Sequence, residues 1–419
     1  MSYVTGLRCV NCRRTYSAEE VDYFCPVCGY HDGILDVQYD YESIKGELNP
    51  AALAQNRDLS MWRYLPLLPV ADPTLIPYLQ VGWTPIYDAP RLAKNLGVSR
   101  CWVKDEGRNP TGSFKDRASA LGVAKAMEKQ ASMIACASTG NAASSLAGFA
   151  AAAAMPAVIF VPEGAPEAKV AQLLAFGAQV FSVEGTYDES WELCMRASAE
   201  FGWYNRNCAV NPYLIEGKKT VSLELAEQFA RLTPGSIPDW VVMSVGDGCT
   251  IAGVWKGLRE MHILGLIPRL PRVLGVQADG CKPFVTAWKG KCGLTPCQAH
   301  TIADSIAVGY PRNFSKGMQA VTESGGAFVS VSDEEILRSI PLLARSVGVF
   351  GEPAGVTPVA GVRRAVESGV IDRRERVAII MTGNGLKDVR SAMRAVGAAI
   401  HVRRDIEDIR KAIEVAVTA

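Results

Sequence analysis

The sequence has almost no excess of charge of either sign. Its 44 Lys and Arg residues nearly balance its 43 Asp and Glu residues, which leaves a formal net charge of +1 over 419 residues. Such a chain offers no electrostatic case for nucleic acid or an anionic membrane, and we expect neither as a partner. Long apolar runs are also missing. The most apolar stretch, residues 146–161, is rich in alanine and contains Pro156, so it predicts a buried helix leading into a strand rather than a membrane span.

A targeting segment and a histidine-based site are missing as well. Residues 1–7 carry neither a basic leader nor an apolar signal core, which favours a cytoplasmic protein. The composition, with 48% hydrophobic and 21% charged residues, is typical of a globular enzyme. The four histidines, His31, His262, His300 and His401, form no recognisable catalytic arrangement, so we expect surface or structural roles for them.

Cysteine is too dilute for a disulfide scaffold, with 12 residues in the chain, yet four cysteines are clustered. Cys9 and Cys12 form one Cys-x-x-Cys pair, Cys25 and Cys28 form another, and twelve residues separate the two pairs. This spacing is typical of a zinc ribbon, in which four thiolates close a tetrahedral site and leave no open position. We therefore predict a structural Zn²⁺ site. The alternatives are a ribbon without metal and a ribbon closed by disulfides.

The order of segments predicts an α/β protein. Residues 1–38 would form the ribbon, residues 39–90 a connecting arm rich in aromatics and proline, and residues 91–419 the main core. A smaller α/β subdomain is expected at about residues 118–205. Short apolar strands alternate with alanine- and leucine-rich helices, which predicts mainly parallel sheets covered by helices on both faces. The predicted strands are 101–104, 133–137, 157–161, 179–183, 240–244, 272–277 and 377–381.

One lysine stands at a position that suits chemistry. Lys115 follows the polar, glycine-containing turn 109–114 and precedes an alanine-rich helix. An amine held at such a junction is desolvated and fixed in direction, which favours Schiff-base formation. The alternative is an ordinary lysine near a helix N-terminus, paired with Asp116.

Three further loops connect strands to helices, where ligands gather in parallel sheets. Loop 138–141 offers hydroxyls and free amides that suit a carboxylate. Loop 246–250 has two glycines and a threonine at a helix start, and its spacing favours a small phosphate over a nucleotide. Loop 382–388 places a threonine hydroxyl at a buried strand end. Each loop alone is equally explained as a helix cap or a turn.

Taken together and in this order, the loops resemble the fold-type II pyridoxal phosphate (PLP) enzymes, and within them the threonine synthase group. The resemblance extends to Gly-Trp-Thr-Pro at 82–85, Lys-Asp-Glu at 104–106, residues 168–172 and Glu-Pro-Ala at 352–354. A similar N-terminal ribbon is found on many threonine synthase-like chains. The resemblance implies two doubly wound parallel-sheet domains plus the small ribbon, PLP as cofactor, a small amino-acid substrate and a homodimer.

The resemblance also implies a role for each loop. Lys115 would hold PLP as a Schiff base and then move protons, Asn141 would bind the cofactor's 3-hydroxyl, and Thr382 would face the pyridine nitrogen. A neutral hydroxyl at that nitrogen favours elimination and replacement over transamination. The substrate α-carboxylate would be bound by Ser138, Thr139 and Gly140, and the cofactor phosphate by Gly246, Asp247, Gly248, Cys249 and Thr250.

The substrate pocket departs from the threonine synthase pattern. That group shows Asn-Ser-x-Asn-Pro-x-Arg before Glu-Gly-Gln-Lys-Thr, and these polar groups grip the phosphate of O-phosphohomoserine. Here Cys208, Ala209 and Leu214 replace the asparagine, serine and arginine, and Asp247 replaces an asparagine in the cofactor-phosphate loop. Leucine cannot make the bidentate bonds of an arginine. We therefore expect a threonine synthase-like lyase that acts on a different small amino acid, by β- or γ-elimination or replacement.

Other functions stay open at this point. Arg206, Lys218 or Arg312 could supply the missing charge from another direction, and the chain would then be an authentic threonine synthase. A cysteate synthase-type enzyme that joins O-phosphoserine and sulfite is a further alternative, as is a hydroxyamino-acid ammonia-lyase. A cofactor-free binding protein is the non-enzymatic alternative, and the intact lysine, asparagine and threonine of the loops argue against it.

Overall fold

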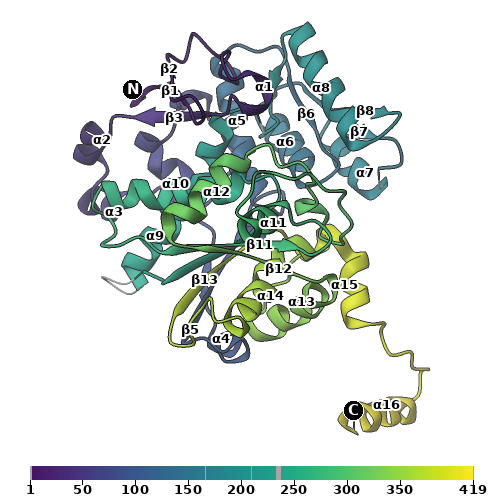
Figure 1. The fold of residues 1–419 in the computed structure, drawn as a ribbon. Coiled ribbons are helices and arrows are strands. Elements are labelled where there is room, and N and C mark those ends of the chain that lie inside the picture. Colours follow the sequence, from purple (N-terminus) through teal and green to yellow (C-terminus); the bar gives the residue numbers. More distant parts are fainter. Residues whose placement is uncertain (1, 166, 209, 233–236, 419) are drawn as a thin grey trace.

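The computed structural model describes residues 2–165, 167–208, 210–232 and 237–418. It contains a 3-stranded, a 6-stranded and a 4-stranded sheet. Figure 1 shows the small N-terminal sheet lying against the rest of the chain, and the last helix, α16, standing away from it. Among the described residues, no helix is both long enough and apolar enough to cross a membrane. Ala209, one of the three substituted pocket positions, lies outside the described residues.

The N-terminal sheet carries the two cysteine pairs. Its strands are antiparallel in the order β2-β1-β3, and they are β1 (Val4–Cys9), β2 (Thr15–Tyr16) and β3 (Leu35–Tyr39). The short helix α1 (Gly29–Asp32) follows the second cysteine pair. The segment after the sheet is not wholly irregular. It contains α2 (Tyr41–Glu47), α3 (Pro50–Gln55) and the 3-10 helices η1 (Met61–Leu67) and η2 (Pro73–Leu75).

The six-stranded sheet forms the centre of the larger body. Its order is β12-β11-β10-β13-β5-β4, and its pairs are parallel except for the antiparallel edge strand β4. The strands are β4 (Ile86–Asp88), β5 (Arg100–Asp105), β10 (Trp240–Ser244), β11 (Arg272–Ala278), β12 (Ala327–Val331) and β13 (Arg376–Met381). β10 is buried along its whole length, as expected for a parallel strand covered on both faces.

Helices cover both faces of this sheet. Apolar side chains of α9, α10, α11 and α12 build one core cluster, and those of α4, α13 and α14 build the other. These helices are α4 (Pro90–Leu96), α9 (Tyr213–Leu232), α10 (Cys249–Ile263), α11 (Pro283–Gly290), α12 (Phe314–Ser324), α13 (Asp333–Val347) and α14 (Pro353–Glu367). The remaining C-terminal elements are η4 (Asp304–Ile306), η5 (Gly385–Asp388), α15 (Val389–Val396) and α16 (Ile406–Thr418).

The four-stranded sheet is parallel throughout, in the order β8-β7-β6-β9. Its strands are β6 (Ile134–Ala137), β7 (Ala157–Pro162), β8 (Gln179–Val183) and β9 (Tyr204–Asn205), and the helices beside it are α5 (Lys115–Glu128), α6 (Asn141–Ala152), α7 (Glu167–Ala175) and α8 (Tyr187–Phe201). Two mainly parallel sheets covered by helices, together with a small antiparallel ribbon, confirm the predicted fold class.

Candidate active site

The four loops singled out in the sequence all follow the carboxyl ends of parallel strands. Strands β5, β10 and β13 are neighbours in the larger sheet and lead to the Lys115, 246–250 and 382–388 loops, while β6 of the smaller sheet leads to loop 138–141. Backbone contacts join two of them directly. Phe114 N donates to Thr382 O at 2.8 Å, and Asn384 N donates to Gly112 O at 2.9 Å. The turn before Lys115 and the Thr382 loop therefore lie side by side.

Lys115 is the first residue of α5, and its amine does not pair with Asp116. The Asp116 carboxylate turns back to Thr111, accepting from its backbone N at 2.7 Å and from its hydroxyl. Burial, together with the positive charges of Lys218 and Arg206, lowers the pKa of Lys115 to about 8. A lysine with such a pKa is partly neutral near pH 7 to 8, and the neutral amine is the form that attacks a carbonyl.

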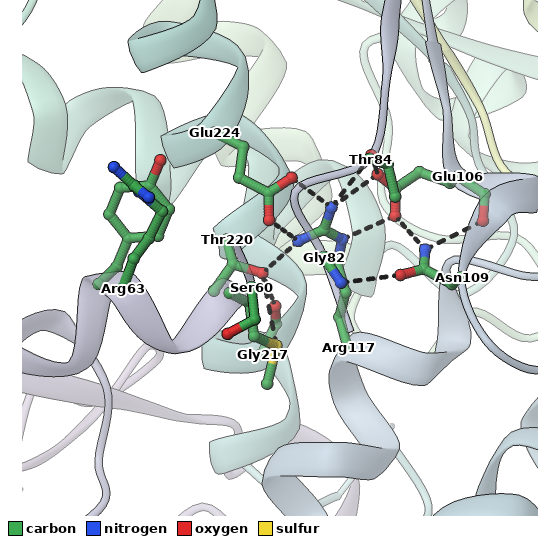
Figure 2. A network of polar contacts seen from close by, with 12 residues as sticks. Ser60, Arg63, Gly82, Thr84, Glu106, Asn109, Arg117, Gly217, Thr220 and Glu224 are labelled. Atoms are coloured by element: carbon green, nitrogen blue, oxygen red, sulfur yellow. Dashed lines mark hydrogen bonds and ion pairs between the residues drawn. The ribbon is translucent and has the colours of Figure 1, made fainter. Parts of the chain in front are cut away.

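A buried network of charges holds the start of α5 in place (Figure 2). Arg117 Nε lies 2.7 Å from Glu106, and Arg117 NH1 lies 2.6 Å from Glu224 of α9. Thr84 donates its hydroxyl proton to Glu106 at 2.6 Å, and Lys104 pairs with Glu224 at 2.8 Å. The 82–85 and 104–106 motifs thus belong to one scaffold.

Close helix packing completes this scaffold. A Cβ at Gly217 of α9 would lie 2.2 Å from the carbonyl oxygen of Arg117. Glycine is therefore required there for α9 to approach α5. The approach also lets Thr220 accept a hydrogen bond from Arg117 NH1 at 2.9 Å.

Loop 138–141 ends at the first turn of α6 and opens into a cavity. Thr139, Gly140 and Asn141 line this cavity with Glu352, while Ser138 accepts a hydrogen bond from Gly140 N at 3.1 Å. Asn141 Nδ2 donates to Glu352 Oε1 at 2.7 Å. Burial raises the pKa of Glu352 to about 7, against the lowering effect of that hydrogen bond. Further lining residues are Ser144, Lys169, Gln172, Ile302, Asp304, Ser305, Pro353, Ala354, Lys387 and Asp388.

Loop 246–250 joins β10 to α10 and brings its backbone close to neighbouring segments. Gly248 has φ +89°, and a Cβ there would lie 2.6 Å from Asn313 O. Asp247 accepts a hydrogen bond from Arg312 N at 2.6 Å and one from Cys249 Sγ at 3.6 Å. The amides at the α10 N-terminus form the kind of cradle that binds a small phosphate.

The side chain of Arg312 contacts residues of α8. Its guanidinium lies over the Trp191 ring, with Cζ 4.0 Å from the ring centroid, and it contacts Asp188 at 3.5 Å. Its backbone N, by contrast, binds Asp247. The structure thus gives Arg312 a contact with the 246–250 loop, whereas substrate binding by its side chain stays a prediction.

Two other cations lie beside Lys115. Arg206 and Lys218 are buried, with exposed fractions of 1% and 2%. Arg206 donates to Ser119 Oγ at 3.1 Å, to Cys208 Sγ at 3.4 Å and to the carbonyl oxygen of Lys115 at 3.5 Å. Leu214 packs into the core instead: a Cβ at Gly122 of α5 would lie 2.8 Å from it.

No carboxylate neutralises this cation cluster of Lys115, Arg206 and Lys218 within the ranges that the structure describes. Asp116 and Asp247, whose charges act on Arg206 and Lys218, are hydrogen-bonded elsewhere, and burial raises the pKa of both carboxyl groups. Although burial disfavours a thiolate at Cys208, Lys218, Arg206 and Lys115 lower its pKa. Buried cations that no carboxylate balances are costly, so such a cluster favours binding of an anion.

Comparison with known proteins decides the family. The family model described as "Pyridoxal-phosphate dependent enzyme" matches residues 78–383. The threonine synthase of Methanocaldococcus jannaschii is 39% identical over 410 residues, covering 97% of this chain and 99% of that protein. The threonine synthase of Methanosarcina acetivorans is 42% identical over 411 residues, covering 97% and 98%. This chain is a PLP-dependent enzyme of the threonine synthase family.

Solved structures of PLP enzymes share the fold. A threonine deaminase from T.th. is 26% identical, with a TM-score of 0.61 over 72% of this chain and 92% of that chain. Diaminopropionate ammonia lyase from Escherichia coli, at 19% identity, matches the fold alone, with a TM-score of 0.66 over 84% and 94%. The family, the fold type and the enzymatic nature expected from the sequence are therefore confirmed.

The residues present fit the cofactor of this family. Lys115 offers an amine of lowered pKa, and the neighbouring Ser113 hydroxyl is buried without a hydrogen-bond partner in the described part of the chain. An orphaned hydroxyl at this place is satisfied when a polar ligand binds. Glycine at 248 lets the 246–250 loop pack against Asn313, because a Cβ there would lie 2.6 Å from Asn313 O. The cofactor contacts assigned to Asn141, Thr382 and loop 246–250 stay predictions.

The cysteine cluster has the geometry of a metal site. The four sulfurs of Cys9, Cys12, Cys25 and Cys28 lie within 4.8 Å of one another. Cys9 Sγ is 3.8 Å from Cys28 Sγ, and Cys12 Sγ is 3.6 Å from Cys25 Sγ. A tetrahedral site with metal–sulfur bonds of about 2.3 Å has edges of about 3.8 Å. The thiols are free, so the cluster can hold a metal ion.

Some functional candidates were not evident from the sequence. Glu352 was visible only as part of the 352–354 motif, yet it binds Asn141 directly. Lys387 lines the cavity and donates to Ser144 at 3.2 Å and to Gln172 at 3.3 Å. A lysine within the 382–388 motif was visible in the sequence, but nothing in the pattern indicated that it faces α6.

Proposed function

We propose that the enzyme releases phosphate from an O-phosphorylated small amino acid, and that its reaction is conversion of O-phosphohomoserine and water to threonine and phosphate. The observation that carries the proposal is the pair of buried cations, Arg206 and Lys218, beside Lys115. The relatives named threonine synthase, which match nearly the whole chain, support the same reaction. The sequence favoured a substrate without phosphate, because Cys208 and Leu214 indicated that phosphate-binding groups had been lost. The proposal departs from that expectation because Arg206 and Lys218 supply positive charge beside Lys115.

The chain's own groups would divide the work of catalysis. When bound, PLP supplies an electron sink for negative charge at the substrate α-carbon. Lys115 Nζ takes the proton from that carbon and returns it, since a pKa of about 8 lets the amine exchange protons near neutral pH. Arg206 and Lys218 bind the substrate phosphate and stabilise the charge that it carries away.

The loops would orient the reacting groups. The amides and hydroxyls of 138–140 bind the substrate α-carboxylate, and those of 246–250 bind the cofactor phosphate. The Asn141 amide nitrogen is engaged by Glu352 at 2.7 Å, so its amide oxygen is the group offered to the cofactor's hydroxyl. Thr382 would meet the ring nitrogen with a neutral hydroxyl.

A second reaction is favoured by the position of the cations. Arg206 donates to the carbonyl of Lys115 itself at 3.5 Å, so the charges lie close to the reacting amine. A phosphate on the β-carbon lies nearer to the α-carbon than one on the γ-carbon. Replacement of the phosphate of O-phosphoserine by sulfite is therefore the second candidate, and the same cations would attract the anionic nucleophile.

The test is turnover of a substrate panel by the cofactor-loaded enzyme. Release of inorganic phosphate is measured with O-phosphohomoserine and with O-phosphoserine, the latter with and without sulfite. Serine and threonine, assayed for keto-acid formation, represent the ammonia-lyase alternative. We expect turnover of a phosphate ester only, and none by Lys115→Ala. Keto-acid formation without phosphate release from either ester would overturn the proposal.

We also propose that the cysteine cluster binds Zn²⁺ in a structural role. Its support is the tetrahedral spacing of the four sulfurs. Metal analysis of purified protein should give one zinc per chain, and Cys12→Ser should lower that content. The predicted homodimer rests on the family resemblance, and light scattering checks it.

A further inference from the structure

The ribbon touches both bodies of the enzyme. On the larger side, Asp36 of β3 lies 2.9 Å from Lys316 of α12 and 3.3 Å from Lys256 of α10. Although burial opposes ionisation, Lys256 and Lys316 hold the pKa of Asp36 well below its ordinary value. On the smaller side, the Tyr23 hydroxyl accepts from Asn205 N of β9 at 3.0 Å.

The turn after the second cysteine pair carries aromatic residues that contact both bodies. Gly29 N donates to Cys25 O at 2.9 Å, so the turn is folded on the cysteine cluster. The Tyr30 ring lies 5.6 Å from the Trp191 ring of α8, and the His31 ring lies 6.2 Å from the Tyr310 ring. Tyr30 is held by its ring, because its buried hydroxyl has no hydrogen-bond partner among the residues described.

From Trp191 the contacts continue to the cofactor loop. The Arg312 guanidinium stacks on the same Trp191 ring at 4.0 Å. The Arg312 backbone N then binds the Asp247 carboxylate at 2.6 Å, and Asn313 N donates to Asp247 O at 3.0 Å. A continuous line of contacts thus runs from the cysteine cluster through Tyr30, Trp191 and Arg312 to Asp247.

We propose that Tyr30, Trp191 and Arg312 are positioning residues for the 246–250 loop, and that the ordered ribbon fixes the cofactor-phosphate cradle through them. The inference rests on the proposed role of this loop in binding the cofactor phosphate. The stacked arginine and the ribbon aromatics restrict where Asp247 and the following amides lie. Loss of the Tyr30 ring therefore loosens the cradle although Tyr30 touches neither cofactor nor substrate.

The test is the dissociation constant of PLP, measured by absorbance titration of cofactor-stripped protein without substrate. Tyr30→Ala should weaken PLP binding by about fivefold to tenfold, since one aromatic contact contributes about 1 kcal/mol. Tyr30→Phe should restore the wild-type constant, because it removes only an unpaired hydroxyl. Val27→Ala, at an exposed ribbon position, is the matched control. At saturating PLP, kcat of Tyr30→Ala should stay within about threefold of wild type.

Arg312→Ala and Trp191→Leu extend the test to residues outside the ribbon, because Tyr30→Ala could disturb the folding of the ribbon. Each should weaken PLP binding. In the Arg312→Ala/Trp191→Leu double variant the loss of PLP binding free energy should be smaller than the sum of the two single losses, since both residues act through one stack. Wild-type PLP affinity in all three variants would overturn the proposal. Because the titration contains no substrate, a wrong assignment of the reaction leaves this result unaffected. Gly248→Ala would displace the loop, because its Cβ would lie 2.6 Å from Asn313 O. Unaltered PLP binding in that variant would instead refute the loop's role.

Discussion

Two groups of buried charges each have members on helices α5 and α9, and they are built in opposite ways. In the first, Arg117 and Lys104 face Glu106 and Glu224, so two cations meet two carboxylates, all with side chains 0% exposed. In the second, Arg206 and Lys218 surround Lys115 without a carboxylate partner among the described residues.

This difference distinguishes a group of charges that stabilises the fold from a group that can bind a ligand. A balanced network satisfies its own charges and fixes the helices that carry it. A cluster with surplus positive charge weakens the folded chain until an anion arrives, and it lowers the pKa of Lys115 meanwhile. On this account the first group holds the lysine in place and the second binds what the lysine acts on.

The largest effect is expected from breaking the balanced network. Arg117→Met leaves Glu106 and Glu224 buried with one cation fewer, which should lower the free energy of unfolding by about 3–5 kcal/mol. Denaturant unfolding measures the loss. Arg374→Met, at a guanidinium that is 90% exposed, should change stability by less than about 0.5 kcal/mol. Equal stability of the Arg117 variant and wild type would remove the distinction between the two groups.

Removal of the two cations beside Lys115 should weaken substrate binding and leave stability intact. Arg206→Met with Lys218→Met removes buried charge that has no carboxylate partner, so the ligand-free protein should be as stable as wild type or more stable. Each charge-assisted hydrogen bond contributes about 1.5–3 kcal/mol, so KM for a phosphate ester should rise by about a hundredfold or more. Steady-state kinetics and unfolding on the same samples check both parts. A strong loss of stability with unchanged KM would make this cluster another scaffold.

A smaller effect is expected on the protonation of Lys115. Reattachment of PLP to stripped enzyme needs the neutral amine, so its rate should rise with pH and level off above about pH 8. Removal of Lys218 and Arg206 should move this midpoint upward, towards the ordinary lysine value of 10.5, because the lost charges no longer oppose protonation. Stopped-flow absorbance at several pH values measures the rate. An unmoved midpoint in the double variant would mean that burial alone sets the pKa.

The smallest effect concerns Glu352, a buried acid that is paired with an amide. Its pKa is raised from 4.5 to about 7, so between these values the folded chain keeps a proton that the unfolded chain releases. The free energy of unfolding should therefore fall as pH rises through this window. Glu352→Gln should flatten that slope, which urea unfolding at about pH 4.5, 6 and 7.5 would reveal. The same slope in the variant would assign it to other groups.

Much of the fold was readable because its signals are local. The seven predicted strands all occur, since each is a short run rich in apolar residues between turn residues, and all but β8 are mostly buried. In the two larger sheets, strands β4, β9 and β12 were missed. β4 and β9 have only 3 and 2 residues, which is too short for a period to show. β12 is longer, at 5 residues, but Ser330 interrupts its apolar run and its burial is mixed.

The sequence predicted the loops of the site better than it predicted the positions of its charged side chains. The Lys115 and Thr382 loops follow neighbouring strands, so their meeting follows from the order of the sheet. Arg206 follows the end of β9 and Lys218 belongs to α9, and only the tertiary packing places both beside Lys115. The stacking of the Arg312 guanidinium on Trp191 likewise depends on tertiary packing and was not visible in the sequence.

The most direct test of the central claim is phosphate release from O-phosphohomoserine by wild-type enzyme and by the Arg206→Met/Lys218→Met variant, both loaded with PLP. We expect release by wild type, with threonine formed in equal amount, and a KM raised by about a hundredfold in the variant. Equal KM values in the two proteins, or turnover restricted to unphosphorylated amino acids, would contradict it.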